Sequence, residues 1–167
     1  LLFFVVLSHT TYSQNNSNFL NNFSIEYGIN WVDSSGNHDP LTIFKDYSDI
    51  AFNLPFKFEI DYLLNNTFEL YLSGSSNKFL ENQKIDVLDS DSTYNYFSID
   101  FGVKHAVFDI DVYTTSVVGF AKVGLGVFKV ESLGFSANIG AGGIIRLTEK
   151  TDFVISSVAK FALEHEY

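Results

Sequence analysis

Apolar and polar residues alternate along much of the chain, and one stretch of this kind occurs three times. FSIEYGI at residues 23–29 returns with small changes as FSIDFGV at 97–103 and as FSANIGA at 135–141. In each copy the odd-numbered positions are apolar, and the positions between them hold Ser, then an acid or Asn, then Gly. A period of two is typical of a β-strand, whose two faces then differ in chemistry. The pattern predicts strands but leaves open which face points inward.

The alternation predicts an all-β protein built as an antiparallel, up-and-down meander. The expected strands span about 23–31, 50–62, 68–79, 95–107, 112–123, 135–147 and 152–163. Four-residue turns at 64–67, 108–111 and 148–151 alternate with longer connections at 33–49, 80–93 and 124–134. Tight turns at one end and long loops at the other are typical of membrane β-barrels. The orientation of the strand at 112–123 stays open, because small residues occupy both of its faces.

The polar face of the strands decides between two barrel architectures. A soluble lipocalin-like barrel turns its apolar face inward around an apolar ligand, whereas an outer-membrane barrel turns that face outward to lipid. Here the polar face places charged residues beside small ones, for example Glu26 near Gly28 and Asp100 near Gly102. A long charged side chain needs a small neighbour inside a narrow barrel but not on a solvated surface. The polar face is therefore predicted to point into the lumen of a transmembrane β-barrel of the eight-stranded type.

Acids and bases on the polar face are nearly equal in number, so they can pair inside the barrel. The predicted lumen charge network, with a structural role, comprises Glu26, Lys57, Glu59, Asp61, Glu69, Asp100, Lys104, Arg146 and Lys160. Lys122 lies on the strand whose orientation stays open. Charges removed from bulk water must pair or incur a heavy desolvation cost. Most of the net charge of −10 is therefore expected in loops and turns.

Length and composition limit the remaining classes of protein. A chain of 167 residues is typical of a single domain. A net charge of −10 without a basic stripe argues against a nucleic-acid partner, because nothing is present to neutralise a row of phosphates. The absence of Cys removes disulfides and thiolate metal sites.

The sequence predicts a signal peptide at the N-terminal end and a further strand at the C-terminal end. Residues 1–13 join an apolar run to small polar residues and are predicted to be a secretory signal peptide, whose start lies upstream because the sequence contains no Met. A buried strand is the alternative for this run. Residues 14–22 are then a polar leader, and 23–167 are the barrel domain. Seven strands cannot close this barrel with antiparallel neighbours, so an eighth strand is expected beyond Tyr167. Without that strand, a gap is expected between the first and the last of the seven strands.

Several segments resemble a known family of membrane barrels. GINWVDSSG at 28–36, LPFKFEIDYLLNNTFELYLSGS at 54–75, YFSIDFGVKH at 96–105 and NIGAGGIIRLTEKTDFVISS at 138–157 resemble the N-terminal barrel of outer-membrane protein A-like (OmpA-like) proteins of Bacteroidota. The resemblance covers most of residues 23–163. It implies an eight-stranded barrel in the outer membrane of a Gram-negative cell, in contact with outer-membrane lipid. It also implies that a periplasmic domain that binds peptidoglycan can follow such a barrel.

No catalytic, cofactor-binding or metal-binding residue is predicted. The His residues have no obvious partner in the sequence, and His105 is interpreted as an interfacial residue. The stretch at 86–92 carries Asp86, Asp89 and Asp91 but lacks the Gly and the distal Glu of a calcium loop, so a solvated acidic loop is favoured. The predicted function is a non-catalytic structural or surface-exposed anchor with a narrow or plugged lumen. Two alternatives stay open, a secreted lipocalin-like carrier of an apolar ligand and an outer-membrane lipid-modifying enzyme.

Overall fold

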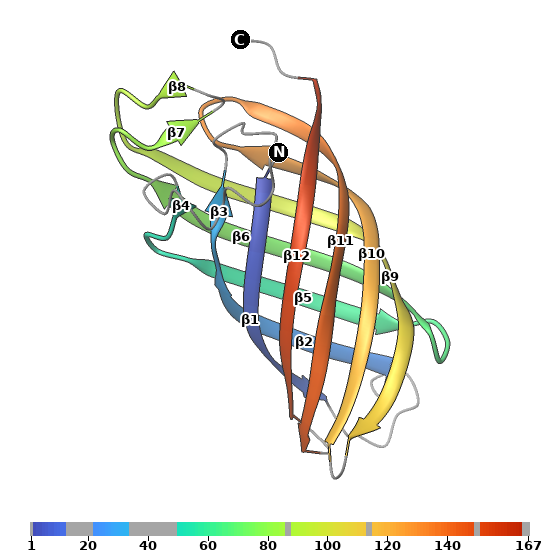
Figure 1. Ribbon diagram of the computed structural model, residues 1–167. Coiled ribbons are helices and arrows are strands. Elements are labelled where there is room, and N and C mark those ends of the chain that lie inside the picture. Colours follow the sequence, from blue (N-terminus) through green and yellow to red (C-terminus); the bar gives the residue numbers. More distant parts are fainter. Residues whose placement is uncertain are drawn as a thin grey trace.

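A closed antiparallel sheet makes up most of the part of the chain that the structure describes. The computed structural model describes residues 2–12, 22–33, 50–85, 88–112, 115–148 and 151–164. In this part of the chain one sheet curls round until its first and last strands pair (Figure 1). The fold is an up-and-down β-barrel, which confirms the predicted all-β, antiparallel class. No helix among the described residues is long and apolar enough to cross a membrane.

Eight long strands form the wall of the barrel, and four short strands lie at one end of it. The long strands are β1 (Leu2–Tyr12), β2 (Phe23–Asn30), β5 (Phe56–Leu63), β6 (Phe68–Phe79), β9 (Tyr94–Val112), β10 (Thr115–Lys129), β11 (Leu133–Thr148) and β12 (Thr151–Glu164). The short strands are β3 (Val32–Asp33), β4 (Ile50–Ala51), β7 (Lys84–Ile85) and β8 (Leu88–Asp89). β7 and β8 form a separate small hairpin beside the rim (Figure 1). We call the end with the short strands the loop end and the opposite end the turn end.

Strand β1 closes the barrel. It pairs antiparallel with β12 along nearly its whole length, starting with Leu2 opposite Lys160, and with β2 along its second half. The expected gap between the first and last strands is therefore wrong, because the segment predicted to be a signal peptide fills it. Pairing on both sides satisfies backbone groups that an open edge would expose. Cleavage of residues 1–13 and a further strand beyond Tyr167 stay predictions.

Two of the expected connections are wrong, and both errors have the same cause. Residues 108–111, expected to turn, continue β9, and residues 124–134, expected to form a long loop, hold the end of β10 and the start of β11. Gly and Asp are rare in strands, and their presence favoured a break at both places. In the barrel a neighbouring strand pairs with each segment, and this tertiary pairing overrides the local preference. β6, by contrast, has its predicted bounds.

The tight turn between β5 and β6 shows how local sequence fixes the register of the lumen residues. Asn65 Oδ1 accepts hydrogen bonds from the backbone N–H groups of Thr67 and Phe68, both at 3.0 Å. An Asn side chain thereby takes the place of a backbone carbonyl in the turn. The resulting register places Glu59 opposite Ser73. A one-residue slip would turn every lumen side chain of β5 outward.

Candidate functional site

The polar positions of the repeated stretch point into the barrel in all three copies. Buried polar residues are Ser24 and Glu26 on β2, Ser98 and Asp100 on β9, and Ser136 and Asn138 on β11. The apolar positions between them, such as Ile25, Ile99 and Ile139, are exposed on the outside. Two copies contact each other directly, because Asn138 Nδ2 donates a hydrogen bond to Asp100 Oδ1 at 2.8 Å. The repeat thus supplies the same inward row on three strands.

Glu59 lies at the centre of the charges inside the barrel. Its side chain is fully buried. Three ammonium groups surround it, with Lys57 Nζ at 2.9 Å, Lys104 Nζ at 2.9 Å and Lys122 Nζ at 3.2 Å from its carboxylate oxygens. These lysines come from β5, β9 and β10. One carboxylate therefore joins strands that lie far apart in the sequence.

Three other buried acids of the lumen each pair with a lysine. Glu26 pairs with Lys57, Asp100 pairs with Lys160, and Asp61 Oδ1 lies 2.8 Å from Lys104 Nζ. We call the eight buried residues of this network the charged layer: Glu26, Lys57, Glu59, Asp61, Asp100, Lys104, Lys122 and Lys160. Its four acids balance its four lysines. Because a buried ion pair offsets its desolvation cost only when both partners are present, the charged layer is expected to act as a unit.

The structure brings seven of the nine residues predicted for the lumen network into the charged layer. Glu69 lies at its edge, with a side chain 29% exposed and 3.8 Å from Lys104 Nζ. Arg146 lies outside it, which corrects the expectation: its side chain is 54% exposed and lies 3.9 Å from Asp109 Oδ2. Arg146 lies near the turn end of β11, opposite Asp152 on β12. Lys122, whose orientation the sequence left open, belongs to the charged layer.

Glycines make room for the long side chains of the lumen. A Cβ atom on Gly102 would lie 2.1 Å from the Val123 carbonyl oxygen and 2.8 Å from the Tyr71 ring, and one on Gly124 would lie 2.3 Å from Tyr71 Oη. Tyr71 therefore lies directly over these two glycines, which face each other across β9 and β10. Its ring centre is 5.1 Å from Lys122 Nζ, a cation–π contact. The small residues of the polar face thus position both an aromatic ring and a charge.

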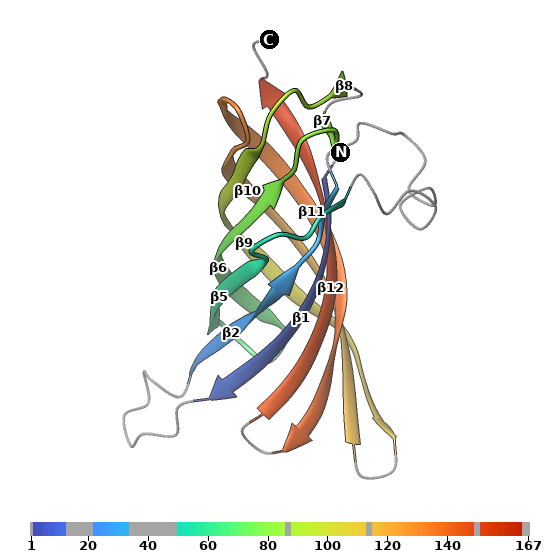
Figure 2. The same ribbon diagram turned by 90° about the vertical axis from the view of Figure 1, so that its left-hand side faces the viewer.

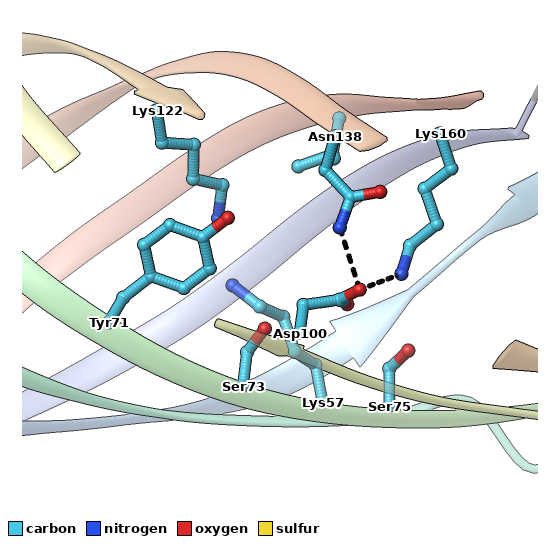
Figure 3. A pocket seen from close by; sticks show the side chains of 9 residues that line it. Lys57, Tyr71, Ser73, Ser75, Asp100, Lys122, Asn138 and Lys160 are labelled. Carbon is cyan, nitrogen blue, oxygen red and sulfur yellow. Dashed lines mark hydrogen bonds and ion pairs between the residues drawn. The ribbon is translucent and has the colours of Figure 1, made fainter. Parts of the chain in front are cut away.

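A small cavity remains between the charged side chains. Its volume is about 20 Å³, and Figure 3 shows Tyr71, Lys122, Asp100, Lys160 and Asn138 around it. A space of this size holds about one water molecule. Asn138 Oδ1 has no hydrogen-bond partner among the described residues, and a water here would donate to it. A cavity of this size is too small for an organic ligand.

Apolar side chains fill the lumen toward the loop end. We call this buried cluster the apolar plug, and it consists of Val32, Ala51, Phe79, Tyr96, Phe128 and Val158. The rings of Phe79 and Tyr96 meet edge to face with centroids 6.5 Å apart. Phe79 is completely buried, although it lies at the end of β6 and beside the rim. The lumen is therefore closed by hydrophobic packing above the charged layer.

Three carboxylates lie close enough to share a metal ion, but lysines already neutralise them. Oxygen atoms of Glu26, Glu59 and Asp61 lie within 4.8 Å of one another. Lys57 contacts the first two, and Lys104 contacts the last two. The ammonium groups thus stand where a metal ion would bind. This arrangement favours ion pairing over metal coordination.

His105 lies on the outside of the barrel near the turn end. Its ring stacks on Phe68 with centroids 4.3 Å apart, and its Nδ1 lies 3.2 Å from the Thr67 carbonyl oxygen. In the acidic loop, the Tyr94 hydroxyl donates to Asp91 Oδ1 at 2.8 Å, and this hydrogen bond lowers the pKa of Asp91. His38, His165 and Asp86 fall outside the described residues, so the expectations for them stay open.

Fold and lumen together define a narrow, closed β-barrel with an apolar exterior and a charged interior. No protein-family model matches the sequence, and a search of curated proteins finds no match. A search of solved structures finds the attachment invasion locus protein Ail of Yersinia pestis, with 12% identity, coverage of 95% of each chain and a TM-score of 0.34. At this TM-score the class assignment rests on the strand pairing and burial of the chain itself.

Proposed function

We propose that the chain is an integral β-barrel of the outer membrane that serves as a structural or surface-exposed anchor, without catalysis. The observation that carries the proposal is the inverted distribution of polarity. Large apolar side chains exposed on the outer wall include Ile25, Leu72, Ile99, Phe101, Val123, Leu125, Phe135, Ile139, Ile155 and Phe161. The charged layer, in contrast, is buried. An apolar surface of this extent is unusual for a protein in water and matches a lipid environment.

The backbone supports the same proposal. In lipid every N–H and C=O group must be paired within the protein, which only helices and closed barrels achieve. β6 has 12 residues and β12 has 14, enough for a tilted crossing that needs about 9–11. Each wall strand of the barrel pairs with a neighbour on both sides for most of its length.

Aromatic pairs near both ends of the wall fit the two membrane surfaces. Phe23 and Tyr62 have ring centroids 4.9 Å apart near the turn end. Trp31 and Phe52 stack at 5.1 Å near the loop end. Aromatic side chains gather at the headgroup level of membrane barrels. These pairs therefore mark the expected limits of the apolar band.

The lumen gives little support to a carrier of an apolar ligand. Pockets for small molecules commonly have volumes of about 300–1,000 Å³ and mostly apolar walls. The cavity in the charged layer has a volume of about 20 Å³, far below this range. A lipid-modifying enzyme is also disfavoured, because the contacts described for His105 are with Phe68 and Thr67 and not with a Ser or Asp.

Membrane extraction tests the proposal. We expect the full-length protein to stay in the membrane fraction after alkaline carbonate and to dissolve only with detergent. Ile25→Arg and Phe101→Arg are each expected to make insertion less favourable by about 2–4 kcal/mol near the midplane. Urea titration in lipid vesicles measures this change. Phe101→Leu is the matched control and should insert normally. A protein that is soluble without detergent, or Arg variants that insert like the control, would contradict the membrane assignment.

Conductance tests the closed lumen. Because the charged layer and the apolar plug fill the interior, we expect at most small and rare conductances in planar bilayers. Stable channels of porin size would contradict a structural role.

The resemblance to barrels with a peptidoglycan-binding neighbour leads us to propose outer-membrane lipid as the main partner and peptidoglycan as a partner of any domain that follows.

A further inference from the structure

Strand β9 extends beyond its neighbour β6 at the turn end of the barrel. β6 pairs with β9 only as far as Phe68 opposite His105, and the last contact is a hydrogen bond of 2.8 Å from Ala106 N to Thr67 O. Past this point β9 pairs with β10 alone among the described strands. The lower end of β9 accordingly lies below the β5–β6 turn in Figure 1. We call residues 107–112 the open β9 edge.

The open β9 edge has two chemically different faces. Phe108 and Ile110 continue the outer apolar face and are 51% and 53% exposed. Asp109 and Asp111 point to the other side and are also exposed. A β-bulge leaves Val107 between the two registers, because Phe120 pairs with Ala106 while Gly119 pairs with Phe108. The edge therefore alternates apolar and acidic side chains over five residues.

The acidic face keeps an excess of negative charge. Asp109 accepts a hydrogen bond from Ser116 Oγ at 2.6 Å and has Arg146 Nη2 at 3.9 Å. Asp111 lies opposite Ser116, two pairs further along the strand than Asp109. Arg146 also lies opposite Asp152 on β12, so among the described residues carboxylates outnumber basic groups in this part of the sheet. A basic side chain placed beside the open β9 edge would neutralise the negative charge that remains there.

An open strand edge cannot face lipid, because lipid leaves its N–H and C=O groups unpaired. In the proposed membrane the open β9 edge must therefore lie in water at the turn end, because the short turns of outer-membrane barrels lie in the periplasm. This placement rests on the proposed function, whereas the exposure of residues 107–111 does not. An accessible edge of this kind is a template for another strand. Pairing with a second copy of itself is disfavoured, because like charges would meet across the ladder.

We propose that the open β9 edge binds an extended peptide segment of another protein, which adds to the sheet as a strand. The segment carries Lys or Arg at alternate positions, on the face that meets Asp109 and Asp111. Backbone hydrogen bonds supply the affinity in this mode of recognition, and the alternate side chains supply the selectivity. The apolar side chains of the segment lie beside Phe108 and Ile110 on the other face.

Peptide binding to the detergent-refolded full-length chain tests this proposal. The probe is a fluorescein-labelled peptide of about eight residues that alternates Lys and Val, and the readout is fluorescence anisotropy. We expect Asp109→Asn combined with Asp111→Asn to weaken binding about tenfold, because two opposite-charge pairs are lost. The control variant, Asp91→Asn combined with Glu131→Gln, removes two exposed acids at the loop end and should leave the affinity unchanged. Equal weakening in both variants would overturn the proposal, as would equally tight binding of a Glu–Val peptide.

Cross-linking gives a second measurement that does not depend on charge. The chain has no Cys, so Ile110→Cys provides a single thiol beside the open β9 edge. We expect it to form a disulfide with a Cys placed in the peptide, whereas Leu133→Cys, exposed at the loop end, should not. Equal cross-linking at the two sites would overturn the proposal. Disulfide-linked dimers of Ile110→Cys without peptide would assign the edge to a second copy and overturn the proposed occupant. Both assays work in detergent, so a failed membrane assignment leaves their outcome readable.

Discussion

The two regions that close the lumen, the charged layer and the apolar plug, are held by different forces. In the charged layer, Glu59 is tied to Lys57, Lys104 and Lys122 by contacts of 2.9 to 3.2 Å. In the apolar plug, Phe79 packs against rings and aliphatic side chains without a polar partner. The first region depends on the charge of each group and the second on its volume. Substitutions that keep the shape but change the charge, or the reverse, should therefore separate the two.

The largest effect is expected for Glu59→Gln. The side chain keeps its size but loses the charge that three lysines share. Lys57 and Lys104 keep Glu26 and Asp61 as partners, whereas Lys122 loses the carboxylate that it contacts. We expect the free energy of unfolding to fall by about 3–5 kcal/mol, measured by urea titration in vesicles with the fluorescence of Trp31 as the signal. Glu69→Gln is the matched control, because its partly exposed carboxylate is 3.8 Å from Lys104 Nζ, and it should cost about 0–1 kcal/mol. Equal losses in the two variants would show that the charged layer does not act as a unit.

An intermediate effect is expected for Gly102→Ala in the wall of the charged layer. The new methyl group would meet the Val123 carbonyl oxygen, a backbone atom that cannot rotate away, so we expect a loss of about 1–3 kcal/mol. Gly134→Ala makes the corresponding change beside the apolar plug, where the nearest atom is Phe128 Cζ at 2.8 Å. An aromatic side chain can shift further than a backbone carbonyl, so the loss should be smaller than for Gly102→Ala. Thermal shifts of the folded band in gel assays measure both, and a reversed order would contradict the assigned packing.

The smallest effect is expected for Phe79→Leu in the apolar plug. The replacement stays apolar and fills most of the same space, so the free energy of unfolding should fall by less than about 1.5 kcal/mol. Conductance should stay at the wild-type level, because the charged layer still closes the lumen below. A loss as large as that of Glu59→Gln would mean that the edge-to-face contact with Tyr96 matters more than volume.

The alternation of the sequence was enough to predict the architecture and most of the charged layer. A period of two assigns every second residue to one face, and Gly28 or Gly102 beside an acid indicates that this face is crowded. Glu26, Glu59 and Asp100 follow directly from that rule, since each lies on a strand with a clean alternation. The information needed is local, and the sequence contains it.

The parts that the sequence did not predict depend on neighbouring strands. The placement of Lys122 was open, because small residues on both faces of β10 hide the alternation. Arg146 obeys the alternation, but its side chain is exposed near the turn end, where it lies beside Asp109 of β9 and not in the charged layer. The pairing of residues 2–12 with β12 links segments from opposite ends of the chain, and a short apolar run carries no signal of a partner so distant.

The balance of the charged layer also has a consequence for how barrels share a membrane. Its acids and lysines cancel, so the net charge of −10 falls entirely on the rest of the chain. In the membrane proposed above, neighbouring copies would therefore repel each other through the solvent at the barrel ends. The range of this repulsion is about 10 Å at 0.1 M salt and shrinks to about 3 Å at 1 M. Ionic strength should accordingly set how densely the barrels pack, while the interior of each barrel is shielded from the same change.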